Sequence, residues 1–239
     1  MTEKLDSIYE SVCVGQERER LPQQYRQGWT GFSTDLPEHA VVKAAAQEWA
    51  AGWRRGQQSG LRLGGSVGCG KTRVGCAILS DLIRHGIARG ELVRVVFANA
   101  AETFASIQAS WHSNEISEHS ILRRLHEADV LFLDDLGSEA GRDGVAPAFV
   151  QERLFILMDK ISRDGSPTLI TASNLGLVVP EPSLTTFYGA GNGARIVSRM
   201  IDLTRRLAQF PAVDMRRQAQ IAPKERAAAP PRPERAAIG

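Results

Sequence analysis

A glycine-rich stretch that ends in lysine and threonine has the clearest chemical pattern in the sequence. It comprises Gly65, Ser66, Val67, Gly68, Cys69, Gly70, Lys71 and Thr72, and it matches the pattern G-x-x-x-x-G-K-[ST]. Glycines let the backbone turn tightly, so that several N–H groups converge on phosphate oxygens. Lys71 supplies a point charge for the β- and γ-phosphates, and Thr72 presents a hydroxyl to Mg²⁺. The stretch therefore predicts a binding site for ATP and Mg²⁺.

A second pattern, an apolar run followed by two carboxylates, lies further along the chain. Residues 130–133 are apolar, and Asp134 and Asp135 follow directly. Such a run is typical of a strand buried on both faces. We expect Asp134 to hold Mg²⁺, directly or through water, and Asp135 to orient or deprotonate an attacking water. Together with the phosphate loop, this acid pair indicates hydrolysis of the bound nucleotide.

Two further groups are candidates for contacts to the phosphates. Asn174 lies three residues after the predicted strand 168–171. At the end of such a strand, an amide can contact the γ-phosphate or the attacking water. The alternative is a cap or turn residue. Arg195 and Arg199 lie four residues apart, hence on one face of a predicted helix. They form either a solvated basic face or an arginine presented to the ATP of a neighbouring subunit.

Strands and helices alternate around these residues. Short, largely apolar stretches predict strands at 61–63, 130–133 and 168–171, and a stretch rich in β-branched residues predicts a strand at 93–98. Helical patterns predict helices at 37–55, 72–85, 101–111, 116–127, 148–161 and 195–207. Strands separated by helices are typical of an α/β protein with a parallel sheet flanked by helices. Trp49 and Trp53 fall on one face of the first helix, where we expect them to pack into the core.

Composition limits the other functions open to the chain. The sequence has 239 residues, 43% of them hydrophobic, and a net charge of +2, so no overall basic field favours nucleic-acid binding. Three cysteines are too few for a disulfide framework and suit a reducing compartment. We interpret Cys69 as a small filler of the loop, with redox sensing as the alternative. The sequence shows no signal peptide and no apolar run near the roughly 20 residues of a spanning helix, so we expect a cytoplasmic protein.

Three parts are expected along the chain. Residues 1–28 form a short N-terminal extension, in which Leu5, Ile8 and Val12 have the spacing of one amphipathic helix. Residues 29–217 form the ATPase domain. Residues 218–239 are rich in Ala, Pro and Arg without periodicity, which predicts a disordered tail.

In this order, the motifs resemble those of AAA+ ATPases. More closely, the chain resembles the DnaC/DnaI helicase-loader group and its IstB-type transposition relatives. The stretches that carry this resemblance are 21–26 with Trp29 and Phe32, 64–72, 133–139, 167–174, 195–200 and 214–217. The resemblance implies a P-loop NTPase fold of AAA+ type, with a five-stranded parallel sheet and a lid domain that is reduced or absent.

The resemblance also implies an assembly and partners. ATP would lie between the subunits of a homo-oligomeric ring or spiral, with Arg195 or Arg199 completing the neighbouring site. Single-stranded DNA would bind at roughly residues 100–124, including Arg123 and Arg124. Asp135 stands where most AAA+ proteins have Glu, so we expect slow hydrolysis that assembly or DNA stimulates. Two roles stay open: a loader or remodeller of a replicative helicase, or an IstB-like helper that directs a transposase. A nucleotide-gated scaffold without turnover is disfavoured by the complete acid pair.

Overall fold

The computed structural model of the chain describes residues 21–112, 116–139, 141, 143–178, 182–189 and 191–215. The predicted C-terminal tail and most of the predicted N-terminal extension lie outside these residues, as do Arg216 and Arg217. The boundaries expected for the three parts therefore stay predictions. The part of the chain in which a lid would follow the last strand also lies mostly outside them.

Five strands and seven α-helices follow one another through the described residues. The strands are β1 (Gly60–Gly64), β2 (Val95–Asn99), β3 (Val130–Leu136), β4 (Thr168–Ser173) and β5 (Thr204–Arg206). The helices are a 3₁₀ helix, η2 (Gln23–Tyr25), and the α-helices α2 (Pro37–Gly52), α3 (Lys71–Ala88), α4 (Ala100–Ser110), α5 (Glu118–His126), α6 (Ala148–Asp164), α7 (Leu184–Phe187) and α8 (Gly193–Leu203). Among these helices, none is long and apolar enough to span a bilayer.

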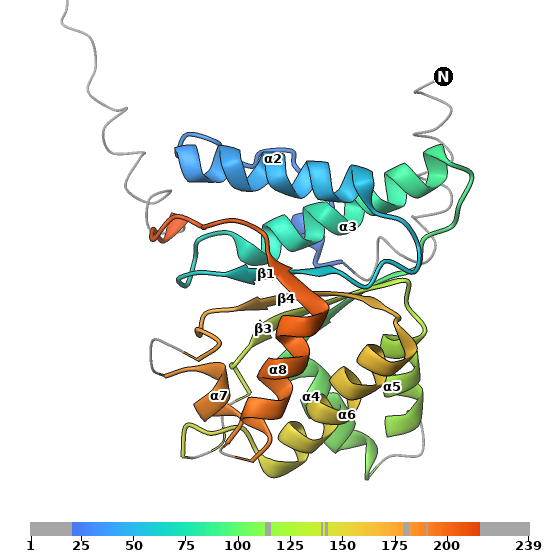
Figure 1. Cartoon of the computed structure of the whole chain (residues 1–239), viewed down its shortest axis with the longest axis vertical. Coiled ribbons are helices and arrows are strands. Elements are labelled where there is room, and N and C mark those ends of the chain that lie inside the picture. The colour runs from blue at the N-terminus through green and yellow to red at the C-terminus, as the bar shows by residue number, and fades with distance from the viewer. Residues whose placement is uncertain are drawn as a thin grey trace, which may run out of the picture.

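The five strands form one parallel sheet in the order β2-β3-β4-β1-β5. Helices α2 and α3 cover one face, and α4, α5, α6 and α8 cover the other (Figure 1). All six residues of the central strand β4 are buried, as expected for a strand covered on both faces. The predicted α/β fold, with a five-stranded parallel sheet flanked by helices, is confirmed.

One predicted element is wrong at its end. The helix expected over 195–207 stops at Leu203, and the next three residues form β5 beside β1. Thr204 lies opposite Gly60 in this pairing. The apolar stripe of α8 ends at Leu203, and a three-residue strand is too short to show alternation in a sequence. Its extended conformation is set by pairing with the free edge of β1, a contact between distant parts of the chain.

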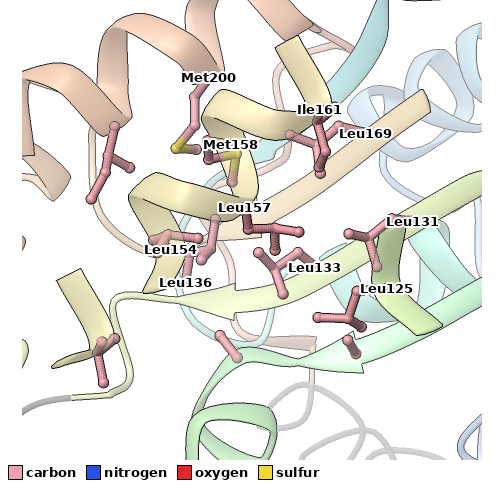
Figure 2. Packing of buried hydrophobic residues seen from close by; sticks show 14 of the residues in the cluster. Leu125, Leu131, Leu133, Leu136, Leu154, Leu157, Met158, Ile161, Leu169 and Met200 are labelled. Atoms are coloured by element: carbon pink, nitrogen blue, oxygen red, sulfur yellow. The ribbon is translucent and has the colours of Figure 1, made fainter. Parts of the chain in front are cut away.

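Two apolar clusters hold the helices on the two faces of the sheet. On one face, Leu131 and Leu133 of β3 lie in the same cluster as Leu157 and Met158 of α6 and Met200 of α8 (Figure 2). Side chains alternate along this part of β3, so Val130 and Phe132 serve the opposite face.

The second cluster lies under α2 and α3. It contains Phe132 of β3 together with Trp49 and Trp53, which are 4% and 0% exposed, so the predicted core role of these tryptophans is confirmed. Leu21 and Phe210 also belong to it. The segment that precedes β1 and the segment that follows β5 therefore pack on the same face of the sheet as α3.

Candidate nucleotide-binding site

The register of the sheet brings the predicted motifs to one edge. Strand β4 pairs with β1 on one side and with β3 on the other, so that Ser173 lies opposite both Gly64 and Leu136. In a parallel sheet, the loops that follow the strands leave from the same edge. The phosphate loop, the acid pair and Asn174 therefore follow three neighbouring strands.

Two glycines give the phosphate loop its shape. Gly68 and Gly70 have φ angles of 77° and 97°, which other residues rarely adopt. Gly70 is the N-cap of α3, so the helix begins at Lys71. The positive end of the α3 dipole and the loop amides are thereby available to an anion. Cys69 is fully buried beside Gly65, consistent with its interpretation as a filler.

The side chain of Lys71, the first residue of α3, reaches back into this loop and is largely buried. Its Nζ donates to the backbone oxygens of Gly65 at 2.8 Å and Ser66 at 2.7 Å, and to Oδ1 of Asn174 at 2.7 Å. Burial lowers the pKa of Lys71. These three partners are neutral oxygens, which solvate the ammonium without neutralising it. Lys71 thus presents a positive charge that phosphate oxygens can neutralise.

Asp134 lies beside Thr72 at the end of β3. Asp134 is 4% exposed, and burial raises the pKa of its carboxyl to about 6, against the opposing effect of a hydrogen bond with Thr72. A hydroxyl and one carboxylate are hard oxygen ligands, and Mg²⁺ is commonly held by one or two such groups together with phosphates and water. A buried carboxylate is also stabilised by a divalent cation. Thr72 and Asp134 therefore fit the Mg²⁺ that the fold implies.

Asp135 is held in a backbone conformation that few residues adopt. Its φ of 59° makes it the one non-glycine residue with positive φ in the described part of the chain. Asp and Asn tolerate this region better than most residues do. The Oδ1 of Asp135 accepts a hydrogen bond from Nδ2 of Asn174 at 3.2 Å. Asn174 therefore joins the cation of Lys71 to the carboxylate of Asp135 through one amide group.

These residues open into a cleft of about 1550 Å³. Lys71, Thr72, both acids of the pair and Asn174 line it. It extends along α4 and α5, where Ser106 and Arg124 are among its walls. Pockets for small ligands usually measure about 300–1,000 Å³, so the cleft has room for more than one nucleotide.

The same architecture occurs in solved structures of replication proteins. The crystal structure of DnaI matches with a TM-score of 0.57 and 20% identity, over 83% of this chain and 100% of that chain. The DnaC helicase loader matches with a TM-score of 0.61 and 17% identity, over 78% of this chain and 98% of that one. AMPPCP-bound DnaA from Aquifex aeolicus matches with a TM-score of 0.52 and 18% identity, over 86% of this chain and 56% of that one.

This chain has the AAA+ fold. No protein-family model matches the sequence, and no curated protein matches it either. At these identities the likeness concerns the fold, so the function has to be argued from the site.

Arg195 and Arg199, the two arginines predicted to serve a neighbouring subunit, lie away from the cleft of their own chain. Arg195 places its guanidinium over the ring of Phe155, 5.2 Å from the ring centre. Arg199 lies 3.3 Å from Asp159, measured between Nη2 and Oδ1. Both contacts are to α6, and neither arginine lines the cleft. Within one chain, the structure does not bring them to the phosphate loop.

Two contacts to the phosphate loop were not assigned from the sequence. The Nε2 of the buried His39 lies 3.2 Å from the backbone oxygen of Cys69. Met215 donates its N–H to the oxygen of Gly68 at 3.1 Å. His39 sits inside the predicted helix 37–55 with no motif around it, so no sequence signal marked it. Met215 lies in the stretch 214–217, which resembles AAA+ ATPases, and this resemblance was the one sequence signal that could have marked it.

Proposed function

We propose that this chain binds Mg²⁺ and ATP in the cleft and hydrolyses the ATP. The observation that carries the proposal is the hydrogen-bonded series from Lys71 through Asn174 to Asp135, with Asp134 and Thr72 beside it. It combines a cation for the phosphates, an amide, and a carboxylate able to act on water. DnaA from Aquifex aeolicus, which has the same fold, binds AMPPCP, and this supports a nucleotide as the ligand.

The roles of the residues follow from their chemistry. Lys71 exchanges its bonds to the loop carbonyls for bonds to the β- and γ-phosphates. Thr72 and Asp134 would hold Mg²⁺, which would offset the charge on the phosphate oxygens. Asn174 donates to Oδ1 of Asp135 and so orients the carboxylate. The second oxygen of Asp135 accepts the proton of the attacking water.

We further propose that hydrolysis serves DNA replication. In this proposal, the chain assembles into a homo-oligomer with ATP at the subunit interfaces, and it loads or remodels a replicative helicase on single-stranded DNA. The likeness to the DnaC helicase loader supports this function. The cleft also continues from the phosphate loop along α4 and α5, so a strand bound at 100–124 would lie next to the nucleotide. Arg195 is exposed and lies outside its own cleft, as an arginine that serves a neighbouring subunit would.

The test measures ATP turnover and partner binding together. We expect slow release of phosphate by the wild-type chain, stimulated by single-stranded DNA and abolished in Lys71→Ala. We also expect a replicative helicase to be recovered with the ATP-bound chain and not with Lys71→Ala. Absence of ATP binding would refute the ATPase proposal. Recovery of a transposase in place of the helicase would favour the IstB-like role.

A further inference from the structure

A buried pair of side chains lies behind the acid pair and takes no part in the proposed chemistry. Glu139 is 8% exposed and Tyr188 is 0% exposed. The hydroxyl of Tyr188 donates to Oε1 of Glu139 at 3.1 Å. The two residues are 49 positions apart in the sequence, so this bond joins two separate segments of the chain. A carboxylate is costly to bury, and it has to be stabilised by hydrogen bonds where it lies.

Glu139 holds the turn that contains Asp135. Its Oε2 accepts the N–H of Gly137 at 2.8 Å. The same turn is closed by Ser138, which donates from its N–H and its hydroxyl to the backbone oxygen of Asp135, at 3.2 Å and 2.7 Å. Asp135 has positive φ, and Gly137 follows with φ of 96°. Such conformations persist where surrounding contacts over-determine them, and Glu139 supplies one of these contacts from the buried side.

Tyr188 connects this turn to the helix that carries the arginines. Tyr188 is the residue after α7, and its N–H bonds to the oxygen of Leu184 at 3.0 Å. Helix α7 packs directly on α8. Their backbones lie so close at Gly193 that a Cβ there would collide with the backbone oxygen of Thr185. Arg195 lies two residues beyond Gly193. The Tyr188–Glu139 bond is therefore a direct link between the Asp135 turn and the α7–α8 pair.

We propose that Glu139 and Tyr188 are positioning residues for Asp135, and that they tie its placement to the α7–α8 pair. The inference rests on the proposed ATP hydrolysis. Neither side chain lines the cleft, so neither touches the nucleotide. They act on the angle at which Asp135 meets the attacking water, because the turn they hold determines where its carboxylate points. A shift of α8 in a subunit interface would reach Asp135 by this route.

A purely structural role is the competing explanation, and kinetics separates the two. A structural bond, when lost, lowers the melting temperature and leaves turnover per folded molecule unchanged. A positioning bond, when lost, lowers kcat while ATP binding stays the same, because the nucleotide contacts are intact.

The experiment compares Tyr188→Phe with a matched control at the other end of α7. Tyr188→Phe removes the hydroxyl and keeps the ring, and we expect kcat to fall about tenfold with KM for ATP within about twofold. Ser183→Ala removes the capping box of α7, formed with Thr186, and leaves the Tyr188 hydroxyl in place. It should lower the melting temperature and keep kcat.

Variants of Glu139 complete the test. Glu139→Gln can still accept from Gly137 and can donate to the Tyr188 oxygen, so it should retain most of kcat. Glu139→Ala should lose at least as much as Tyr188→Phe. The double variant Glu139→Ala/Tyr188→Phe should be no slower than Glu139→Ala alone, because the two residues act as one unit.

The outcomes distinguish this inference from the proposed function. If the wild-type chain hydrolyses ATP and Tyr188→Phe matches Ser183→Ala in kcat, the positioning role is refuted and the ATPase proposal stands. If Tyr188→Phe does not fold, equal kcat values for Glu139→Ala and Glu139→Gln would overturn the inference. A wild-type chain that binds ATP without hydrolysing it would refute the ATPase proposal, and the positioning role with it.

Discussion

The Nζ of Lys71 and the Oδ1 of Asn174 lie 2.7 Å apart, although 103 positions separate the two residues in the sequence. The contact joins the phosphate loop after β1 to the end of β4. Since the same Asn174 amide donates to Asp135, the Lys71 cation and the proposed general base share one connecting group. A movement of the Lys71 ammonium when phosphate binds would therefore reach Asp135 through Asn174.

Loss of the Lys71 charge should abolish nucleotide binding. We expect Lys71→Ala to weaken binding of Mg·ATP by at least about a hundredfold, since two charge-assisted hydrogen bonds are lost at roughly 1.5–3 kcal/mol each. Lys160→Ala, which removes an exposed lysine of α6, is the control and should bind normally. Isothermal titration calorimetry measures both. Equal affinities would contradict the role assigned to Lys71.

Two variants of Asp135 should separate its chemistry from its backbone conformation. Asp135→Asn keeps an acceptor for Asn174 and tolerates positive φ, so ATP should remain bound while turnover falls about 10²–10⁴-fold. Asp135→Ala should lose turnover and also about 1 kcal/mol of stability, because alanine is strained at φ of 59°. Thermal unfolding compares the two. Unchanged turnover in Asp135→Asn would remove the assignment of Asp135 as the base.

Arg195 or Arg199 should act on the ATP of a neighbouring subunit, and mixing variants tests this role at Arg199. We expect Arg199→Ala and Asp135→Asn each to be inactive alone and to recover some activity when mixed, because a mixed interface contains one intact site. Arg163→Ala is the matched control: Arg163 also pairs with Asp159, at 3.4 Å, and it is largely exposed. An exposed pair contributes about 0–1 kcal/mol, so this variant should stay active. No recovery on mixing would indicate an enzyme that works as a single chain.

The packing of α3 on β3 can be tested at a glycine. A Cβ at Gly75 would collide with the ring of Phe132, so Gly75→Ala should destabilise the protein by about 1–3 kcal/mol. Gly52 is the last residue of α2, and a Cβ added there would meet no atom within 4 Å, so Gly52→Ala is the control and should be neutral or slightly stabilising. Urea unfolding of both variants gives the free energies. Equal stabilities would mean that α3 can shift on the sheet.

Glu139 should make stability depend on pH. Burial raises the pKa of Glu139, and the charge of Asp135 adds to the shift. The folded chain therefore keeps this proton to higher pH than the unfolded chain does. The stability it contributes is full below the unfolded pKa, about 4.3, and is lost as pH rises through the folded value. Glu139→Gln lacks this loss, so its stability relative to wild type should increase with pH above about 4.5. Urea unfolding of wild type and Glu139→Gln between about pH 4 and 8 measures this difference, and a difference in stability that stays constant with pH would contradict the expectation.

Local patterns were sufficient for most of the fold. Four strands and six helices were located from the sequence because apolar periodicity and turn residues act over a few positions. The fifth strand was assigned to a helix, since Thr204 to Arg206 take their conformation from β1 and not from their neighbours. Helix α7 was missed for a similar reason: four residues are too few to show a helical period.

The sequence by itself determined the phosphate loop from Gly65 to Thr72 and the apolar strand that ends in Asp134 and Asp135, because each is encoded within a few adjacent residues. The tertiary structure decided what these residues meet. The bonds from Lys71 to Asn174 and from Tyr188 to Glu139 depend on strand order and helix packing, which no local pattern specifies. The structure likewise placed Arg199 against α6 and away from its own cleft. Contacts between distant segments are set when the sheet and its helices pack together, so they appear only in the folded chain.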